Sequence, residues 1–233
     1  MNAAAPRVHF LRVRCELAFL VASFLWGNFA AGADKVAPFR TGILPLLTKA
    51  GCNAGACHGA ATGQAGFKLS LLGYDPEEDY ERITRERGGR RIDRNASSES
   101  LLLRKPSGQL EHEGGRRLPR HSEAYQKLEH WIDAGAPYGP RDLRVVSIAV
   151  SPEDSFLPAT NRSLSLRVIA ELSDGSREDV TALALYSSND DAIAEVGKQG
   201  DVEVIGHGVT SIMVAVFRAG RRRAYCGAVQ RNG

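Results

Sequence analysis

The segment Ala136–Pro140 divides the chain into two stretches with different hydrophobic patterns. Glycine-rich loops and helical patterns lie upstream, and short stretches of alternating apolar and polar residues lie downstream. Proline and glycine at this density are typical of a linker. The sequence therefore predicts a mixed fold with two domains, a small all-α domain over residues 34–138 and an all-β domain over residues 143–230.

The clearest predicted helix in the first stretch runs from Ser122 to Ala134. Ser122 is a good N-cap, and Gly135 ends the helix. Shorter helices are predicted over Gly42–Lys49 and after Pro76. One face of the Ser122 helix carries its apolar residues at helical spacing, namely Tyr125, Leu128, Trp131 and Ile132.

The second stretch shows the period-two alternation of half-buried strands, most clearly over Ser163–Ala170. Asp174 and Gly175 form a strong hairpin-turn signal. Further short strands are predicted over Val145–Val150, Ile193–Val196, Val202–Ile205 and Thr210–Phe217. Short strands of this number and spacing predict a β-sandwich.

Two cysteines and a histidine stand close together in the run Gly-Cys-Asn-Ala-Gly-Ala-Cys-His-Gly over residues 51–59. Two thiols followed directly by an imidazole is the pattern that attaches a c-type haem. We expect Cys52 and Cys57 to form the thioether bonds and His58 to be the proximal ligand of the iron. The usual spacing has about two residues between the cysteines, and this chain has Asn-Ala-Gly-Ala instead. These residues are small, so we expect the extra backbone to loop outward from the porphyrin.

Two other interpretations of the same three residues remain open. Cys52 and Cys57 could form a disulfide, since disulfides are common in exported proteins. They could also bind zinc together with His58, although a structural zinc site needs a fourth ligand and the sequence has no second cysteine pair.

A bound haem iron usually has a second axial ligand, most often methionine or histidine. No methionine lies in the first domain, which leaves His112, His121 and His130. His130 is predicted to face solvent, and His121 precedes the last helix. His112 lies in a flexible loop before that helix, so we favour it as the sixth ligand, with an open or water-bound site as the alternative.

Arginines near His112 are candidates for the anionic haem propionates, because guanidinium groups form strong hydrogen bonds with carboxylates. We select Arg116 and Arg117 from a wider set that also contains Arg90, Arg91 and Lys105. For each of them, ordinary surface charge is the alternative interpretation.

The N-terminus is typical of a secretory signal peptide. Arg7, Arg12 and Arg14 precede the apolar run Leu17–Trp26, and small residues at Ala31–Ala33 provide a cleavage site. The apolar run is about half of the ~20 residues that a membrane span requires. We therefore expect residues 1–33 to be removed, with no transmembrane span afterwards, and the mature protein to be exported to the periplasm or cell envelope.

Removing the signal changes what the charge implies. The whole chain has a formal net charge of +3, and losing three arginines and Glu16 leaves +1. A nearly neutral mature chain gives no reason to expect a nucleic-acid partner.

Several motifs together carry a resemblance to a known family. They are residues 44–59, which contain the cysteine run, residues 66–76 (Gly-Phe-Lys-Leu-Ser-Leu-Leu-Gly-Tyr-Asp-Pro), residues 112–118 (His-Glu-Gly-Gly-Arg-Arg-Leu), residues 131–137, residues 172–181 and residues 186–190. They resemble the N-terminal part of large planctomycete-type exported proteins. Those proteins carry a cytochrome c-like domain, often followed by a group 2 bacterial Ig-like domain and two domains of unknown function.

The resemblance implies a cytochrome c-like haem domain over residues 34–138 and an Ig-like β-sandwich over residues 143–230. In related cytochrome domains a methionine occupies the position of His112, which supports its assignment as a ligand. The relatives continue beyond the position of Gly233, so the functions of their further domains are not assigned to this chain.

The expected function is single-electron transfer through covalent haem c, without bond-making catalysis. The redox partner is unknown, and we expect the Ig-like domain to contact an envelope protein or polysaccharide. The alternative is a cell-surface adhesion or scaffold protein without haem, closed by a Cys52–Cys57 disulfide.

Overall fold

The computed structural model describes residues 35–157, 162–218 and 221–231, with the side chains of Phe156 and of residues after Val216 left out. The predicted signal peptide, residues 1–33, lies outside this range, so its cleavage stays a prediction. No helix in the described part is long and apolar enough to cross a membrane.

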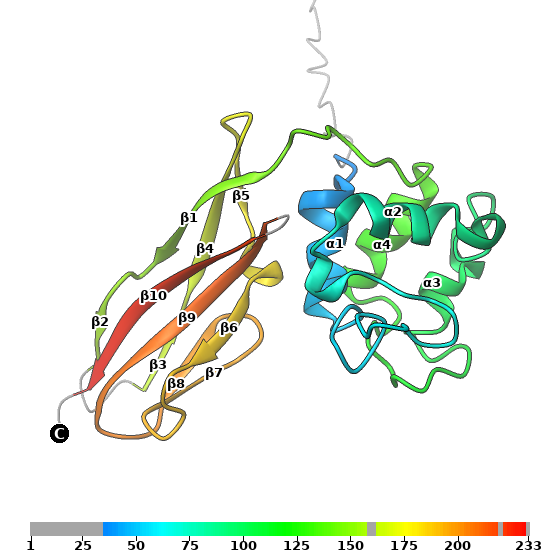
Figure 1. Cartoon of the computed structure of the whole chain (residues 1–233). Helices are drawn as coiled ribbons and strands as arrows, with labels where there is room; N and C mark the ends of the chain where they lie inside the picture. The colour runs from blue at the N-terminus through cyan, green and yellow to red at the C-terminus, as the bar shows by residue number, and fades with distance from the viewer. Residues whose placement is uncertain (1–34, 158–161, 219–220, 232–233) are drawn as a thin grey trace, which may run out of the picture. The chain divides into compact units, whose positions relative to one another are not determined.

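The first part of the chain contains short helices joined by turns (Figure 1). The α-helices are α1 (Leu44–Lys49), α2 (Pro76–Thr84), α3 (Leu101–Arg104) and α4 (Glu123–Asp133). One π-helical turn, η1 (Phe39–Ile43), runs directly into α1, and three 3-10 turns are η2 (Leu71–Gly73), η3 (Glu86–Gly89) and η4 (Ser97–Glu99).

The prediction of an all-α cytochrome c-like domain is wrong. The four α-helices have 6, 9, 4 and 11 residues, and turns and loops make up most of the rest. The physical reason lies in the backbone: Leu72 and Arg87 adopt left-handed conformations with φ of 54° and 55°, as do many glycines of this part. Left-handed residues interrupt right-handed helices, so the glycine-rich segments remain loops.

Helix α4 follows its prediction closely. The Ser122 hydroxyl accepts a hydrogen bond from the backbone N–H of Tyr125 at 3.2 Å, which caps the helix. The predicted apolar face is buried in the core of this part. Trp131 is fully buried, and its indole N–H donates to the carbonyl of Pro137 at 2.9 Å, so the chain after the helix folds back onto it.

The second part is built of strands (Figure 1). They are β1 (Val145–Ser151), β2 (Ser155–Phe156), β3 (Ser163–Ser165), β4 (Arg167–Leu172), β5 (Arg177–Asp179), β6 (Leu185–Ser188), β7 (Ala194–Val196), β8 (Asp201–Val204), β9 (Gly208–Arg218) and β10 (Arg221–Arg231). One 3-10 turn, η5 (Thr181–Leu183), lies between β5 and β6.

These strands form three hydrogen-bonded sheets, with strand orders β1-β4-β5, β2-β10-β9-β6 and β3-β8-β7. All pairs are antiparallel except β2 with β10. The expected two-sheet Ig-like sandwich is therefore not what the sheet topology shows. One cause is that the predicted strand Ser163–Ala170 is split into β3 and β4, which pair in different sheets. Leu166, the residue between them, is buried.

The buried apolar side chains form two clusters, one drawn from residues 39–138 and the other from residues 143–216. The first cluster includes Ala136 and Tyr138 of the predicted linker, so the gap between the clusters lies after Tyr138. What the structure supports is a mixed chain, with short helices followed by mainly antiparallel sheets. Its division into two independent domains stays a prediction.

Candidate functional site

The cysteine run folds into a tight loop directly after α1. The backbone N–H of Cys52 still bonds to the carbonyl of Leu47 at 2.9 Å, which continues the helical turn. Ala54 and Cys57 then form successive turns. The N–H of His58 donates to the carbonyl of Cys52 at 3.0 Å, so the loop closes on itself and holds the first cysteine and the histidine close together.

The spacer between the cysteines is only partly outward-facing. Gly55 and Ala56 are exposed, as expected, but Asn53 is fully buried. Its side-chain N–H donates to the hydroxyl of Thr48 at 2.9 Å, and its backbone carbonyl accepts from the N–H of Leu72 at 3.0 Å. Asn53 therefore anchors the loop to α1 and to the following segment.

Gly59 is needed for this closure. A Cβ built at position 59 would lie 2.1 Å from the backbone oxygen of Asn53, which is too close for any residue with a side chain. The glycine after the histidine therefore lets the chain pass directly beside the start of the loop.

Both cysteines of the loop are free thiols in the structure. Burial, and to a lesser extent the neighbouring Cys57, raise the pKa of Cys52 to about 12, while Arg117 acts in the opposite direction. The Cys52 sulfur is therefore a protonated thiol at neutral pH. The structure gives no support to the disulfide alternative.

His58 is held in one orientation by the segment that follows it. Its Nδ1 atom lies 2.9 Å from the carbonyl oxygen of Phe67, and the ring of Phe67 lies 4.6 Å from the imidazole between centroids. A carbonyl can only accept a hydrogen bond, so Nδ1 carries the proton and Nε2 is left without it. Burial lowers the pKa of His58, which favours the neutral imidazole that a metal requires.

His112 is oriented in the same way from a distant loop. Its Nδ1 atom lies 2.8 Å from the carbonyl oxygen of Gly115, which again leaves Nε2 without the proton. The imidazoles of His58 and His112 are 6.2 Å apart between centroids, with an interplanar angle of 19°. The structure thus brings together the two histidines that the sequence selected as axial ligands.

The remaining histidines do not join this pair. His121 is exposed and has a left-handed backbone with φ of 65°, and His130 is exposed on α4.

The two selected arginines differ in their contacts. The Nε–H of Arg117 donates to the carbonyl of Gly114 at 2.7 Å, and its Nη1 lies 3.9 Å from the position of a Cβ on Gly51, beside the cysteine loop. Arg116 is exposed, and its stem lies beside Gly108. Of the two, Arg117 is the one that lies next to the cysteines.

Arg91, from the wider set of candidates, has a structural role instead. It is buried, and it forms an ion pair with Glu86 at 2.8 Å and donates to the carbonyls of Arg82 and Gly66. Its guanidinium also lies over the ring of Phe67 at 4.2 Å, the ring that packs against His58. Arg91 therefore helps to hold His58 in place through Phe67.

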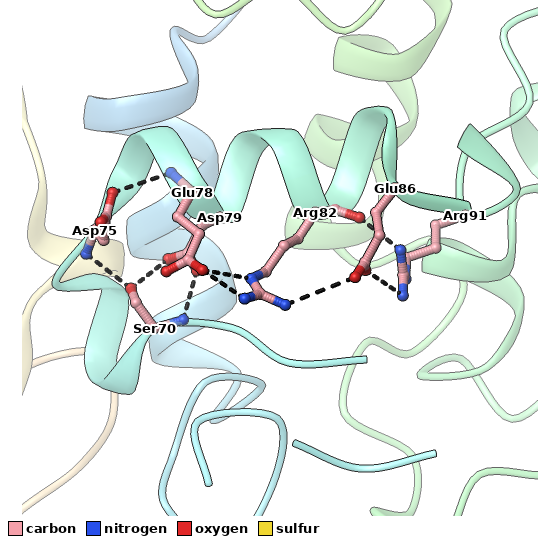
Figure 2. Close-up of polar contacts among 7 residues, drawn as sticks. All are labelled: Ser70, Asp75, Glu78, Asp79, Arg82, Glu86 and Arg91. Atoms are coloured by element: carbon pink, nitrogen blue, oxygen red, sulfur yellow. Dashed lines mark hydrogen bonds and ion pairs between the residues drawn. The ribbon is translucent and has the colours of Figure 1, made fainter. Parts of the chain in front are cut away.

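A second polar network holds Ser70, in the segment that follows the cysteine loop, against helix α2 (Figure 2). Asp79 on α2 is fully buried and accepts hydrogen bonds from the backbone N–H and the hydroxyl of Ser70 at 2.5 and 2.7 Å. The neighbouring N–H of Leu69 donates to the carbonyl of His58 at 2.7 Å. Burial raises the pKa of Asp79 to about 6, although both Ser70 bonds oppose this shift. Helix α2 is thereby tied to the histidine loop.

Sequence reasoning missed the carbonyls that orient the histidines. The carbonyl of Phe67 belongs to the isolated bridge between Gln64 and Phe67, which has no signal in the sequence. The carbonyl of Gly115 does have one, because Gly114 and Gly115 follow His112 and allow the tight return that Nδ1 needs.

In the described ranges, no cluster of three or more His, Cys, Asp or Glu side chains is placed to hold a metal ion, so the zinc alternative gains no support. A bis-histidine haem needs only two such ligands, since the porphyrin supplies the others. Comparison with protein-family models gave no match, and comparison with curated proteins gave none either.

Proposed function

We propose that this protein binds a c-type haem covalently through Cys52 and Cys57, with His58 and His112 as axial ligands, and carries single electrons. The observation that carries the proposal is the pair of imidazoles, each fixed at Nδ1 by a carbonyl. If both Nε2 atoms faced one iron, metal–nitrogen bonds of about 2 Å on each side would separate the ring centroids by roughly 6 Å, and the centroids are 6.2 Å apart. The proposal concerns the loops that present these residues and does not require an all-α domain.

The two histidines bind and orient the iron in this proposal. Metal-binding histidines commonly donate their other N–H to a carbonyl, which fixes the ring and raises its basicity. Phe67 and Gly115 supply these carbonyls here. Because both rings are already held in place, little side-chain entropy is lost when the ligands bind.

Cys52 and Cys57, at the two ends of the four-residue spacer, would hold the haem through thioether bonds. Cys52 is a protonated thiol, and the closed loop keeps it beside His58. Both selected arginines are exposed. Arg116 remains the candidate for a propionate, because the Nε–H of Arg117 already donates to the carbonyl of Gly114.

When bound, the haem supplies a one-electron couple, and two imidazole ligands give a low-spin iron with a lower potential than a histidine–methionine pair. Export to the periplasm or cell envelope is part of the proposal, since haem is attached to c-type proteins outside the cytoplasm. A redox partner that exchanges electrons with this haem, and an envelope protein or polysaccharide that the second part contacts, are also proposed on this basis.

The deciding experiment produces the full chain in a bacterial host together with a c-type haem maturation system. We expect haem that resists acid–acetone extraction and a pyridine haemochrome spectrum of thioether-linked haem. The matched control, Cys52→Ser combined with Cys57→Ser, should carry no covalent haem. Wild-type protein without covalent haem would refute the proposal. Mass spectrometry after thiol alkylation would then show whether the cysteines form the disulfide of the scaffold alternative.

A further inference from the structure

Two hydrogen bonds in the loop around His112 join this residue to Gly115. The carbonyl of His112 accepts from the N–H of Gly115 at 2.9 Å, while the carbonyl of Gly115 lies 2.8 Å from His112 Nδ1. The side chain and backbone of one residue are therefore both tied to the same glycine. This turn fixes the imidazole relative to its own backbone.

Gly114 leaves the space in which the imidazole lies. A Cβ at position 114 would lie 2.9 Å from Cε1 and 3.3 Å from Nε2 of His112. Contacts this short would force the ring to move, because the backbone on the other side is held. Gly114 has no left-handed backbone, so the need for glycine here comes from the imidazole and not from φ.

Arg117 fixes the carbonyl of Gly114 from the other side. Its Nε–H donates to that carbonyl at 2.7 Å, and its own N–H donates to the carbonyl of Pro106 at 2.7 Å. Its Nη1 also lies near Gly51, the residue before Cys52. One side chain thus lies between the His112 loop and the cysteine loop.

We infer that Gly114 and Arg117 are positioning residues that hold His112 ready to bind the iron, and that Arg117 acts through the Gly114 carbonyl rather than as a propionate partner. The role of His112 as a ligand rests on the proposed function. The positioning itself is a property of the chain without haem, so it can be tested separately.

The first test uses the full chain without haem, labelled with nitrogen-15 in its histidines. In the wild-type chain, long-range proton–nitrogen NMR should show His112 as the Nδ1–H tautomer. Gly114→Ala and Arg117→Gln should each lose this preference and show the Nε2–H form that predominates in free histidine. Glu113→Ala and Arg120→Gln, two exposed neighbours, are the matched controls and should keep the wild-type tautomer.

Gly114→Ala could fail to fold, and Arg117→Gln then decides the question, since its side chain is exposed. An unchanged His112 tautomer in Arg117→Gln would overturn the inference for Arg117. An unchanged tautomer in folded Gly114→Ala would overturn it for Gly114.

The second test uses chains carrying covalent haem. Arg117→Gln should retain the covalent haem but lose part of the low-spin signal in electron paramagnetic resonance, and Arg117→Lys should restore part of it. A weakened propionate contact alone would leave the low-spin signal intact, and this result would overturn the inference. If the wild-type chain takes up no haem while the tautomer changes occur, the proposed function fails and the positioning role stands.

Discussion

The imidazoles of His58 and His112 lie nearly parallel at 6.2 Å between centroids, although they belong to loops far apart in the sequence. Each ring has its Nδ1 atom on a backbone carbonyl, that of Phe67 for His58 and that of Gly115 for His112. Two separate loops therefore leave the same atom, Nε2, without the proton, and the proposed function uses this atom of each ring as an iron ligand.

Replacing His112 with alanine should leave the thioether-linked haem in place but abolish the low-spin spectrum, because the iron loses one imidazole. The optical and electron paramagnetic resonance spectra of the purified protein measure this. His130→Ala removes an exposed histidine from α4 and is the control that should behave as the wild type. A low-spin spectrum that survives His112→Ala would show that another group is the sixth ligand.

Gly59→Ala should destabilise the cysteine loop, since the new Cβ would lie 2.1 Å from the Asn53 backbone oxygen. Overpacking against fixed atoms costs about 1–3 kcal/mol of unfolding free energy, which urea titration followed by circular dichroism measures. Gly55→Ala is the matched control, because a Cβ there has its nearest neighbour, Leu71 Cδ1, at 3.8 Å. Equal stabilities of the two variants would contradict the loop packing described above.

Arg91→Ala should reduce stability by about 1–3 kcal/mol, because it removes a buried side chain that donates to two backbone carbonyls and packs on Phe67. Arg91 is 7% exposed and is bound to Glu86, while its neighbour Arg90 is exposed. Arg90→Ala therefore provides a control with the same loss of charge and should stay within about 0.5 kcal/mol of the wild type. If both variants lost stability equally, the effect would come from net charge.

Asp79 should make the protein less stable as the pH rises. Its pKa in the folded chain is raised from 3.8 to about 6 by burial, so the folded state binds the proton more tightly than the unfolded state. The stabilisation from this protonated carboxyl is complete below about pH 4 and is lost as the pH rises through about 6, up to about 3 kcal/mol.

Asp79→Asn tests this dependence, because the amide does not titrate. Other carboxylates change the stability in both chains, so the difference between wild type and variant at each pH isolates Asp79. Urea titrations at pH 4 and pH 7 should show the wild type losing stability relative to Asp79→Asn at the higher pH. A difference that is constant between the two pH values would show that the Asp79 pKa is not raised.

The sequence predicted those elements in which local signals agree. Helix α4 has a capping serine and an apolar face, and both are found in the structure. The left-handed conformations of Leu72 and Arg87 could not be predicted, because neither residue prefers them and tertiary contacts impose them. The helices predicted over Gly42–Lys49, after Pro76 and over Ser122–Ala134 are all present. The error in the fold class comes instead from the short turns and loops that occupy most of the rest of the first part.

The sequence predicts which side chains belong to the candidate site but not the backbone carbonyls that orient them. His112 was selected because the first part of the chain has no methionine, and it does lie beside His58. The orientation of His58 depends on a carbonyl of Phe67, and every residue has a carbonyl. The contacts of Arg91 with Glu86 and with the ring of Phe67 form only in the folded chain, so no pattern in the sequence shows them.

The bond from the N–H of His58 to the carbonyl of Cys52, 3.0 Å long, changes how the wide cysteine spacing should be understood. The bond joins Cys52 and His58 directly, so the number of residues between them need not change the distance between these two residues. Chains with longer or shorter inserts could present the same three groups, provided that an anchor such as Asn53 and a glycine after the histidine are kept. A search for such attachment loops would then do better to look for this closure than to count residues between cysteines.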